Sequence, residues 1–372
     1  MIAAEILIAV LAALAGWLVS RRLRRSKVAI SAGAARAPSP GSAPAPTVPV
    51  PGTAAAGQPA MAGMQTEASM LETASDAMAQ RLWRLAFVAP TVAPPLVRAH
   101  ARVRDLIYAV LQVDELDPNY FPRRPTLMPQ LMQAVNDPAT ASDKLSRMIA
   151  HDPVLTADVL RLANSSLYRT SPAPIESIQR AIVVCGVDAL RGILATAMLR
   201  PVFRASRTNF PRLPRMLWER TERAARAAEL FAAKMHPEDR FEAQLVVLMS
   251  ALGPLVVYSA ALDGYSRAPR LTPNPTLFVD LVCSLGAQMS QRIARDWETS
   301  PRLIAALQKG SSESLATALH VGELLATVSL LESQAVISSD ERLDIMKNAG
   351  MSDALIDGIW ARLGGGVRHE TG

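Results

Sequence analysis

The 372-residue chain contains little cysteine and few aromatic residues, and it has no segment with the strict alternation of apolar and polar residues typical of strands. Its two cysteines, Cys185 and Cys283, lie inside apolar runs, which argues against a disulfide or a cysteine-rich metal site and indicates small buried side chains in a reducing compartment. Aromatic residues make up only 5% of a chain that is half apolar. This composition, rich in alanine and leucine, favours an all-α protein.

The net positive charge is also small outside the N-terminus. The net charge is +6, but five basic residues against Glu5 within residues 1–27 account for four of these charges. The remaining +2 is spread over the rest of the chain, so there is no overall electrostatic attraction to a polyanion. We therefore expect no nucleic-acid partner.

The N-terminal segment reads as a membrane anchor. Residues 2–19 are apolar apart from Glu5, long enough to cross a bilayer, and the basic cluster follows them. We expect a single transmembrane helix in residues 1–20 with the remaining chain in the cytoplasm, because basic residues stay on that side. A cleaved signal or a peripheral helix is the alternative.

The residues after the predicted anchor form two segments, a linker and a helical extension. Residues 21–63 begin with the basic juxtamembrane cluster and continue as an alanine- and proline-rich stretch, which predicts a flexible linker. Residues 64–118 predict two helices, at 66–87 and 96–112, on either side of a proline-rich break. This extension either packs on the main domain or forms a homodimer.

The following region carries helix start and stop signals. Asp152 is a candidate N-cap, and Pro153 is suited to the first helical position. Ser177 predicts a second cap, and Gly186 predicts the end of that helix in a left-handed conformation. Another helix is expected from Asp188 past residue 198.

These residues resemble the HDOD family, the bacterial HD-related output domains. The likeness covers residues 119–332, with residues 333–372 as a C-terminal helical tail. The residues that carry the family signature, which we expect to be structural, are Asp152, Pro153, Leu160, Arg161, Ala163, Asn164, Ser165, Ile182, Gly186 and Arg191. The resemblance implies an HDOD-type helical bundle with a regulatory role in bacterial signalling, related to HD phosphohydrolases. Together with the N-terminal anchor, it predicts a location at the bacterial inner (cytoplasmic) membrane.

The resemblance also implies where a catalytic metal site would lie. HD enzymes hold metal ions with converging histidines and aspartates. The position of their histidine–aspartate pair corresponds best to Ser250 and Ala251, and neither side chain is a good ligand. Two further segments where relatives carry ligands, residues 219–222 and 308–310, contain no histidine. We therefore expect no enzymatic activity, no metal and no cofactor.

Several residues that could belong to a catalytic or ligand-binding site are interpreted as structural. His151 reads as a helix C-terminal residue beside the Asp152 cap, and His320 as a packing or half-exposed residue of an apolar helix at 314–331. Residues 263–265 indicate a loop after a buried helix. The helical face bearing Arg220, Arg223 and Arg226 is interpreted as a solvated, charged surface, with an anionic-ligand site as the alternative.

The tail predicts two more helices. Ser338 and Glu341 form a capping box for a helix to about Asn348, and Ser352 caps another that reaches Leu363. The tail either packs on the bundle or forms a partner surface. The complete sequence thus predicts a membrane-anchored, non-catalytic domain that binds unidentified signalling proteins. The alternatives are a sensor for a nucleotide second messenger and a metal-dependent phosphohydrolase with atypical ligands.

Overall fold

The computed structural model describes residues 58–86, 97–113, 120, 122, 124–135, 141–169, 173–203 and 212–363, and these contain helices and turns but no strand. The predicted transmembrane helix at residues 1–20 and nearly all of the predicted linker at 21–63 lie outside the described residues. The all-α prediction is confirmed for the part of the chain that the structure covers.

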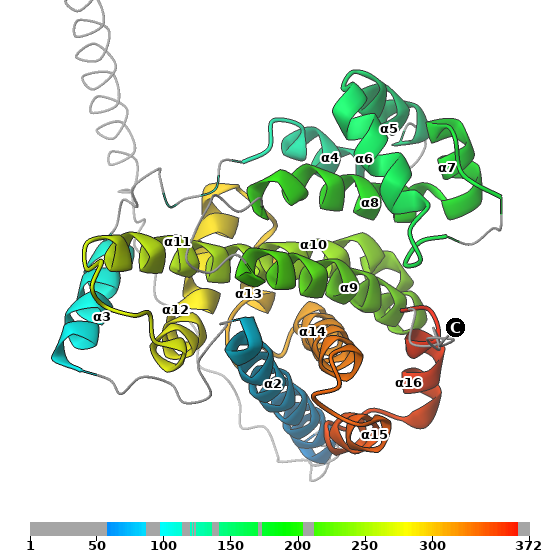
Figure 1. The fold of residues 1–372 in the computed structure, drawn as a ribbon. Coiled ribbons are helices and arrows are strands. Elements are labelled where there is room, and N and C mark those ends of the chain that lie inside the picture. The colour runs from blue at the N-terminus through cyan, green and yellow to red at the C-terminus, as the bar shows by residue number, and fades with distance from the viewer. Residues whose placement is uncertain are drawn as a thin grey trace, which may run out of the picture. The chain divides into compact units, whose positions relative to one another are not determined.

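One group of short helices forms a layer around α8 (Figure 1). Its members are α4 (Met128–Val135), α5 (Ala141–Ala150), α6 (Pro153–Ala163), α7 (Ile178–Cys185) and α8 (Val187–Leu199), followed by the 3-10 turn η1 (Arg200–Phe203). Every residue of α8 from Ala189 to Leu199 is buried. A helix that is covered on all sides is the centre of a layered fold, and α8 packs on both α6 and α10.

Longer helices form the bundle beside this layer. They are α9 (Arg212–Met235), η2 (Pro237–Asp239), α10 (Arg240–Ser250), α11 (Leu252–Ser266), α12 (Pro275–Asp296), α13 (Pro301–Ala306) and α14 (Ser314–Ser333). The most extensive pairings are those of α9 with α14 and of α11 with α12. Gly253 explains the second: a Cβ there would lie 1.9 Å from the carbonyl oxygen of Gly286, so only glycine lets these helices approach so closely.

Helices α6, α12 and α13 each begin with a polar N-cap residue that is followed by proline. The side chains of Asp152, Asn274 and Ser300 each accept a backbone N–H of the first turn. A proline occupies the next position each time, where its missing N–H costs nothing. The predicted cap at Asp152 is confirmed, with N–H donors from Val154 at 2.9 Å and Leu155 at 3.1 Å.

The N-terminal extension packs on the bundle, as one of the two interpretations predicted. Helix α2 (Gln58–Ala86) lies beside α14 and also contacts α12, and α3 (Arg98–Leu111) packs on α11 (Figure 1). Side chains of α2 are described from Ala68 onward. On α2, Leu82 and Trp83 are buried in the core.

The C-terminal tail also packs on the bundle. Helix α15 (Ser339–Asn348) begins at Ser338, whose hydroxyl accepts the N–H of Glu341 at 3.1 Å, so the predicted cap is confirmed. Helix α16 (Asp353–Trp360) follows Ser352, which makes no side-chain cap, and ends three residues earlier than predicted. Helix α15 reaches α2 through Arg81, which donates to Glu341 at 2.7 Å.

Two described helical stretches are long and apolar enough to cross a membrane, Pro237–Ser266 and Ser314–Ser333. In each, 78% of the apolar window is buried inside the fold. They are core helices of the bundle, so their hydropathy reflects burial against protein.

Candidate functional site

The signature residues hold the turn between α6 and α7. The Asn164 side chain donates to the carbonyl oxygens of Leu160 at 2.9 Å and Ile175 at 2.8 Å, and it accepts the N–H of Ile175 at 2.8 Å. Ser165 donates to the carbonyl of Leu162 at 2.7 Å. One amide thus closes an eleven-residue connection between α6 and α7.

The remaining signature residues lie around α6, α7 and α8. Gly186 ends α7 and begins α8 with φ 83° and ψ 162°, so the predicted positive φ is confirmed, although the ψ is extended and not that of a left-handed helix. Arg191 is buried and donates to Asp188 at 2.8 Å. Ala163 is fully buried, Leu160 and Ile182 pack against the core, and Arg161 lies on the surface.

The prediction of a solvated arginine face on α9 was wrong. Arg220 and Arg226 are buried, and Glu229 of the same helix is only 1% exposed. Glu229 accepts hydrogen bonds from Arg226 and, at 2.5 Å, from Arg240. Arg226 also donates to the carbonyl of Leu167 at 2.9 Å and stacks over the ring of Tyr168 at 4.9 Å. These buried charges join α9 and α10 to the turn that the signature residues shape.

At the position that corresponds to the histidine–aspartate pair, a carboxylate is paired with a guanidinium and hydrogen bonded to a serine. Ser250, the last residue of α10, donates to Glu323 of α14 at 2.9 Å. Arg220 of α9 makes an ion pair with the same carboxylate at 3.1 Å, with its side chain 6% exposed and that of Glu323 15% exposed. Arg220 also donates to the hydroxyl of Thr327 at 2.8 Å. The neighbouring Ala251 is buried and offers no donor atom.

This donor set does not fit the divalent ion of an HD enzyme. Of the groups that meet at Ser250, the only carboxylate is Glu323, and it is already neutralised by a guanidinium. A metal ion placed there would lie against the positive charge of Arg220. His320 is near, but among the described residues it does not form a group of three potential ligands with ligand atoms within 4.8 Å of one another. Arg220 and Glu323 were not singled out by the sequence as partners, because they lie 103 residues apart.

A cavity of about 110 Å³ lies next to this set, between α2 and the ends of the bundle helices. Its charged and polar lining comes from α2, α9, α10, α12, α14 and the loop after α13, and consists of Glu72, Asp76, Arg220, Ser250, Ser290, Gln308, Lys309, His320 and Glu323. The structure therefore brings together residues from all three segments where the resemblance places ligands: Arg220, Ser250, and Gln308 with Lys309. It also covers them with α2, which the sequence had not indicated.

Two carboxylates of the cavity have shifted pKa values in opposite directions. Burial raises the pKa of Asp76, and the nearby charge of Lys309 offsets only part of this effect. Burial would likewise raise the pKa of Glu323, but the charges of Arg220 and His320 and the hydrogen bond from Ser250 outweigh it and lower the pKa. Glu323 is thus held as a carboxylate, while Asp76 is destabilised in its charged form.

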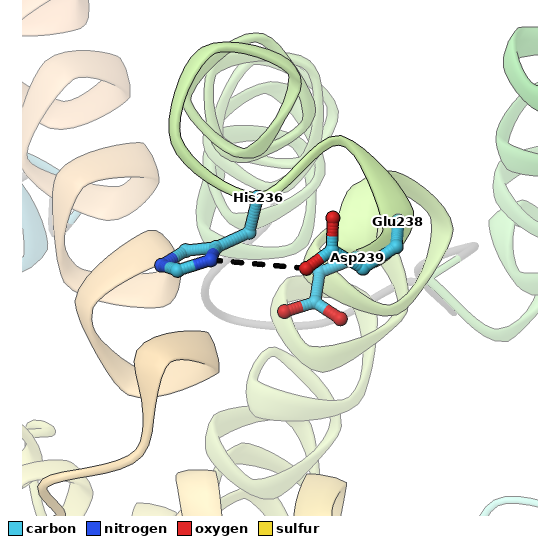
Figure 2. Close-up of side chains that lie close together, drawn as sticks. All are labelled: His236, Glu238 and Asp239. Carbon is cyan, nitrogen blue, oxygen red and sulfur yellow. Dashed lines mark ion pairs between the residues drawn. The ribbon is translucent and has the colours of Figure 1, made fainter.

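Elsewhere in the described residues, one cluster has the composition of a metal site. His236, Glu238 and Asp239 lie at the end of α9 and in η2 with their ligand atoms within 4.8 Å of one another (Figure 2). His236 Nδ1 is 3.9 Å from Glu238, and both side chains are exposed. Asp239 is bound by both terminal nitrogens of Arg302, at 2.6 and 2.5 Å. The one buried carboxylate of this cluster is therefore already neutralised.

The other candidate residues have the following positions. His151 follows the last residue of α5 and precedes the Asp152 cap, as predicted. Residues 263–265 lie inside α11, so the predicted loop was wrong; Tyr120 donates to Asp263 at 2.6 Å and fixes this helix end. His320 is half-buried on α14, as predicted, and it lines the cavity.

Comparisons with known proteins agree with this architecture. The HDOD domain model matches residues 121–312, more than half of the chain. A structure from Shewanella amazonensis, provisionally named a metal-dependent phosphohydrolase, is similar with a TM-score of 0.51 and 17% identity over 72% of this chain and 99% of that chain. An HDOD domain protein of unknown function from Geobacter sulfurreducens is 20% identical, with a TM-score of 0.48 over 72% of this chain and 94% of that one.

At such identity the Shewanella structure shows the fold alone, an all-α HDOD-like helical domain. No curated protein matches the sequence. The family assignment rests on the matched range, which contains the Asp152 cap, the Asn164 turn, Gly186 and the Ser250 position. The chain belongs to the HDOD family.

Proposed function

We propose that this protein is a non-catalytic regulatory domain that acts by binding another signalling protein. The observation that carries the proposal is the ion pair of Arg220 and Glu323, hydrogen bonded to Ser250 at the place where an HD enzyme would hold its metal. A guanidinium is permanently charged and cannot lower the pKa of a bound water as a metal ion does. The residues at this position join α9, α10 and α14 through an ion pair and hydrogen bonds.

The proposal includes a membrane anchor formed by residues 2–19 and a location of the domain in the cytoplasm. The apolar length of this segment and the basic residues that follow it support this part of the proposal. Anchoring through a linker would raise the local concentration of the domain near membrane-bound partners. Fractionation of cells that produce the full chain tests it: the protein should remain with membranes after a high-salt wash, and release by salt would contradict the anchor.

The charges around the cavity weigh against the nucleotide-sensor alternative. Two cations, Arg220 and Lys309, face three carboxylates, those of Glu72, Asp76 and Glu323. A cyclic dinucleotide or guanosine tetraphosphate requires an excess of positive charge around its phosphates. Thermal-shift measurements on the purified full chain should therefore show no stabilisation by these nucleotides, and a saturable increase in the Tm would support the sensor instead.

Two measurements on the full chain in detergent test the central proposal. Metal analysis should give no stoichiometric Mn²⁺ after incubation and desalting, and phosphoester substrates should not be hydrolysed with Mn²⁺ present. Affinity capture from membranes should recover a specific protein partner that an unrelated protein on the same anchor and linker does not recover. Stoichiometric metal with turnover, and no captured partner, would overturn the proposal in favour of the phosphohydrolase.

A further inference from the structure

Helix α2 presents a regular stripe of side chains to the cavity. The four α2 residues that line it are Glu72, Asp76, Ala79 and Trp83. Their spacings of four, three and four residues place them on one face of a helix. An adjacent stripe, with Leu71, Ser75, Leu82 and Ala86, is buried against the bundle. The helix therefore docks with an acidic and aromatic edge over the cavity and an apolar edge beside it.

Each group of the stripe meets a complementary group. The Glu72 carboxylate accepts the Gly310 N–H, with its two oxygens at 3.0 and 3.3 Å. Asp76 makes an ion pair with Lys309 at 3.5 Å. The Trp83 ring lies under the Arg220 guanidinium, 5.4 Å from its centre. These are charge-assisted and cation–π contacts, which recognise a pattern of acids and an aromatic ring and not apolar area alone.

The charged residues that line the cavity beneath α2 favour a negatively charged helix. Without the two carboxylates of α2, the charged lining is Arg220, Lys309 and Glu323, with His320 beside them. Arg220 and Glu323 neutralise each other, so the unpaired charge of the walls is that of Lys309. Their complement is an acidic helix with an aromatic residue.

The fit of α2 is incomplete. A cavity of about 110 Å³ remains beneath it. Two polar atoms at this interface, Ser75 Oγ on α2 and His320 Nδ1 on α14, are buried without a hydrogen-bond partner among the described residues. Ser75 as a whole is fully buried. Buried polar atoms without partners and unfilled space both weaken an interface, so a helix that satisfied them would bind better than α2 does.

We propose that α2 occupies, within its own chain, a groove that binds an acidic amphipathic helix of a partner protein. The groove is the surface of α9, α10, α12, α14 and residues 307–310 that faces α2. The partner helix carries carboxylates at its first and fifth positions, a small residue at the eighth and an aromatic residue at the twelfth, as α2 does from Glu72 to Trp83. This inference rests on the proposed function and adds to it the site and the partner chemistry.

A variant with a weakened α2 tests the proposal in the full chain. Glu72→Lys with Asp76→Lys places positive charge against Lys309, whereas Thr73→Lys with Ala77→Lys adds lysines on the exposed face one residue along. The probe is a fluorescently labelled peptide of residues 66–86, and its binding is measured by anisotropy. The first variant should bind it at least about tenfold more tightly than the wild type, because loss of the two carboxylate contacts opens the groove. The control should match the wild type.

A double-mutant cycle shows whether the peptide occupies the groove. Lys309→Ala, added to the weakened variant, removes the cation without attracting the lysines introduced on α2, and it should reduce binding of the unchanged peptide about twofold to fivefold, because the pair is exposed. A peptide with Asp76→Asn should then bind this variant no more weakly than the unchanged peptide does. If the weakened variant, folded by circular dichroism, binds no better than the control, the proposal is wrong. If it forms a dimer in which the labelled peptide cannot compete, the groove takes α2 of a second copy and the partner assignment is wrong.

Hydrogen exchange on the unaltered chain provides a measurement that needs no variant. Amides of α2 between Leu71 and Trp83 should exchange at least about tenfold faster than those of α14, because α2 opens locally. Equal protection of the two helices would overturn the proposal. If a partner is captured but the Glu72→Lys, Asp76→Lys variant binds it no better than the wild type, the groove inference fails while the proposed function stands; if no partner is captured at all, the proposed function fails.

Discussion

Replacing Arg220 by methionine should destabilise the domain because it leaves a buried carboxylate unpaired. The substitution keeps most of the aliphatic volume but removes the ion pair with Glu323 at 3.1 Å and the hydrogen bond to Thr327 at 2.8 Å. Both charged side chains are largely buried, at 6% and 15% exposure. Breaking such a pair from one side costs about 3–5 kcal/mol, so we expect a loss of this size in the free energy of unfolding at pH 7.

The penalty should depend on pH in a defined direction. In the wild type the pKa of Glu323 is lowered, because the charges of Arg220 and His320 and the Ser250 hydrogen bond outweigh burial. Its contribution to stability is therefore present above the pKa of the unfolded chain and is lost as the pH falls through the folded value. Without Arg220, burial raises this pKa above the unfolded value, so the variant binds a proton on folding and gains stability as the pH falls. The difference between the two proteins should shrink from pH 7 to pH 5.

Urea unfolding followed by far-ultraviolet circular dichroism at pH 8, 7, 6 and 5 measures this difference. Arg215→Met is a matched control on the same helix, because its ion pair with Glu219 is exposed and should matter little. Arg220→Met combined with Glu323→Gln should recover most of the loss, since neither charge is then left buried alone. A penalty that is no larger than that of the control, or that is constant with pH, would refute the reasoning.

Three further substitutions test the signature residues by the same unfolding assay. Gly186→Ala should cost about 1–3 kcal/mol through backbone strain alone, because φ is 83° and no atom lies within 4 Å of the added Cβ; no loss would contradict that conformation. Asn164→Ala should cost about 1–3 kcal/mol by releasing the N–H and carbonyl of Ile175, and its exchange protection should fall. Asp152→Ala should cost about 1 kcal/mol, and Asp152→Asn should retain most of the cap.

Local signals in the sequence were sufficient for several of the helix starts. Caps and prolines act on the residues next to them, so Asp152, Ser177 and Ser338 could be identified without knowledge of the tertiary fold. Residues 263–265 and the ends of α16 are exceptions. Residues 263–265 were predicted as a loop, but Gly264 lies inside α11, where an added Cβ would be 3.2 Å from Val103 of α3. This glycine is explained by close packing of α3, which a single sequence does not show.

The composition of the candidate site could not be predicted from local sequence, because the site is formed by segments that are far apart in the chain. The vacant pair at Ser250 could be inferred by resemblance, but its replacement by Arg220 and Glu323 required α9 and α14 to be placed side by side. The arginines of α9 alternate with acids at helical spacing, and that pattern is the same for a solvated face and for a buried network. Only the cover provided by α10, α14 and the Leu167 turn distinguishes the two.

The contact between Arg81 and Glu341 gives α2 a second attachment, to the C-terminal tail. A helix that touches both the groove and the tail links them thermodynamically. Whatever binds the tail and breaks this contact must change the affinity of the groove for its helix, and a helix in the groove must change the affinity of the tail by the same factor. In the proposed opening of α2, binding at the tail and binding in the groove are thus thermodynamically coupled, although the two segments are far apart in sequence.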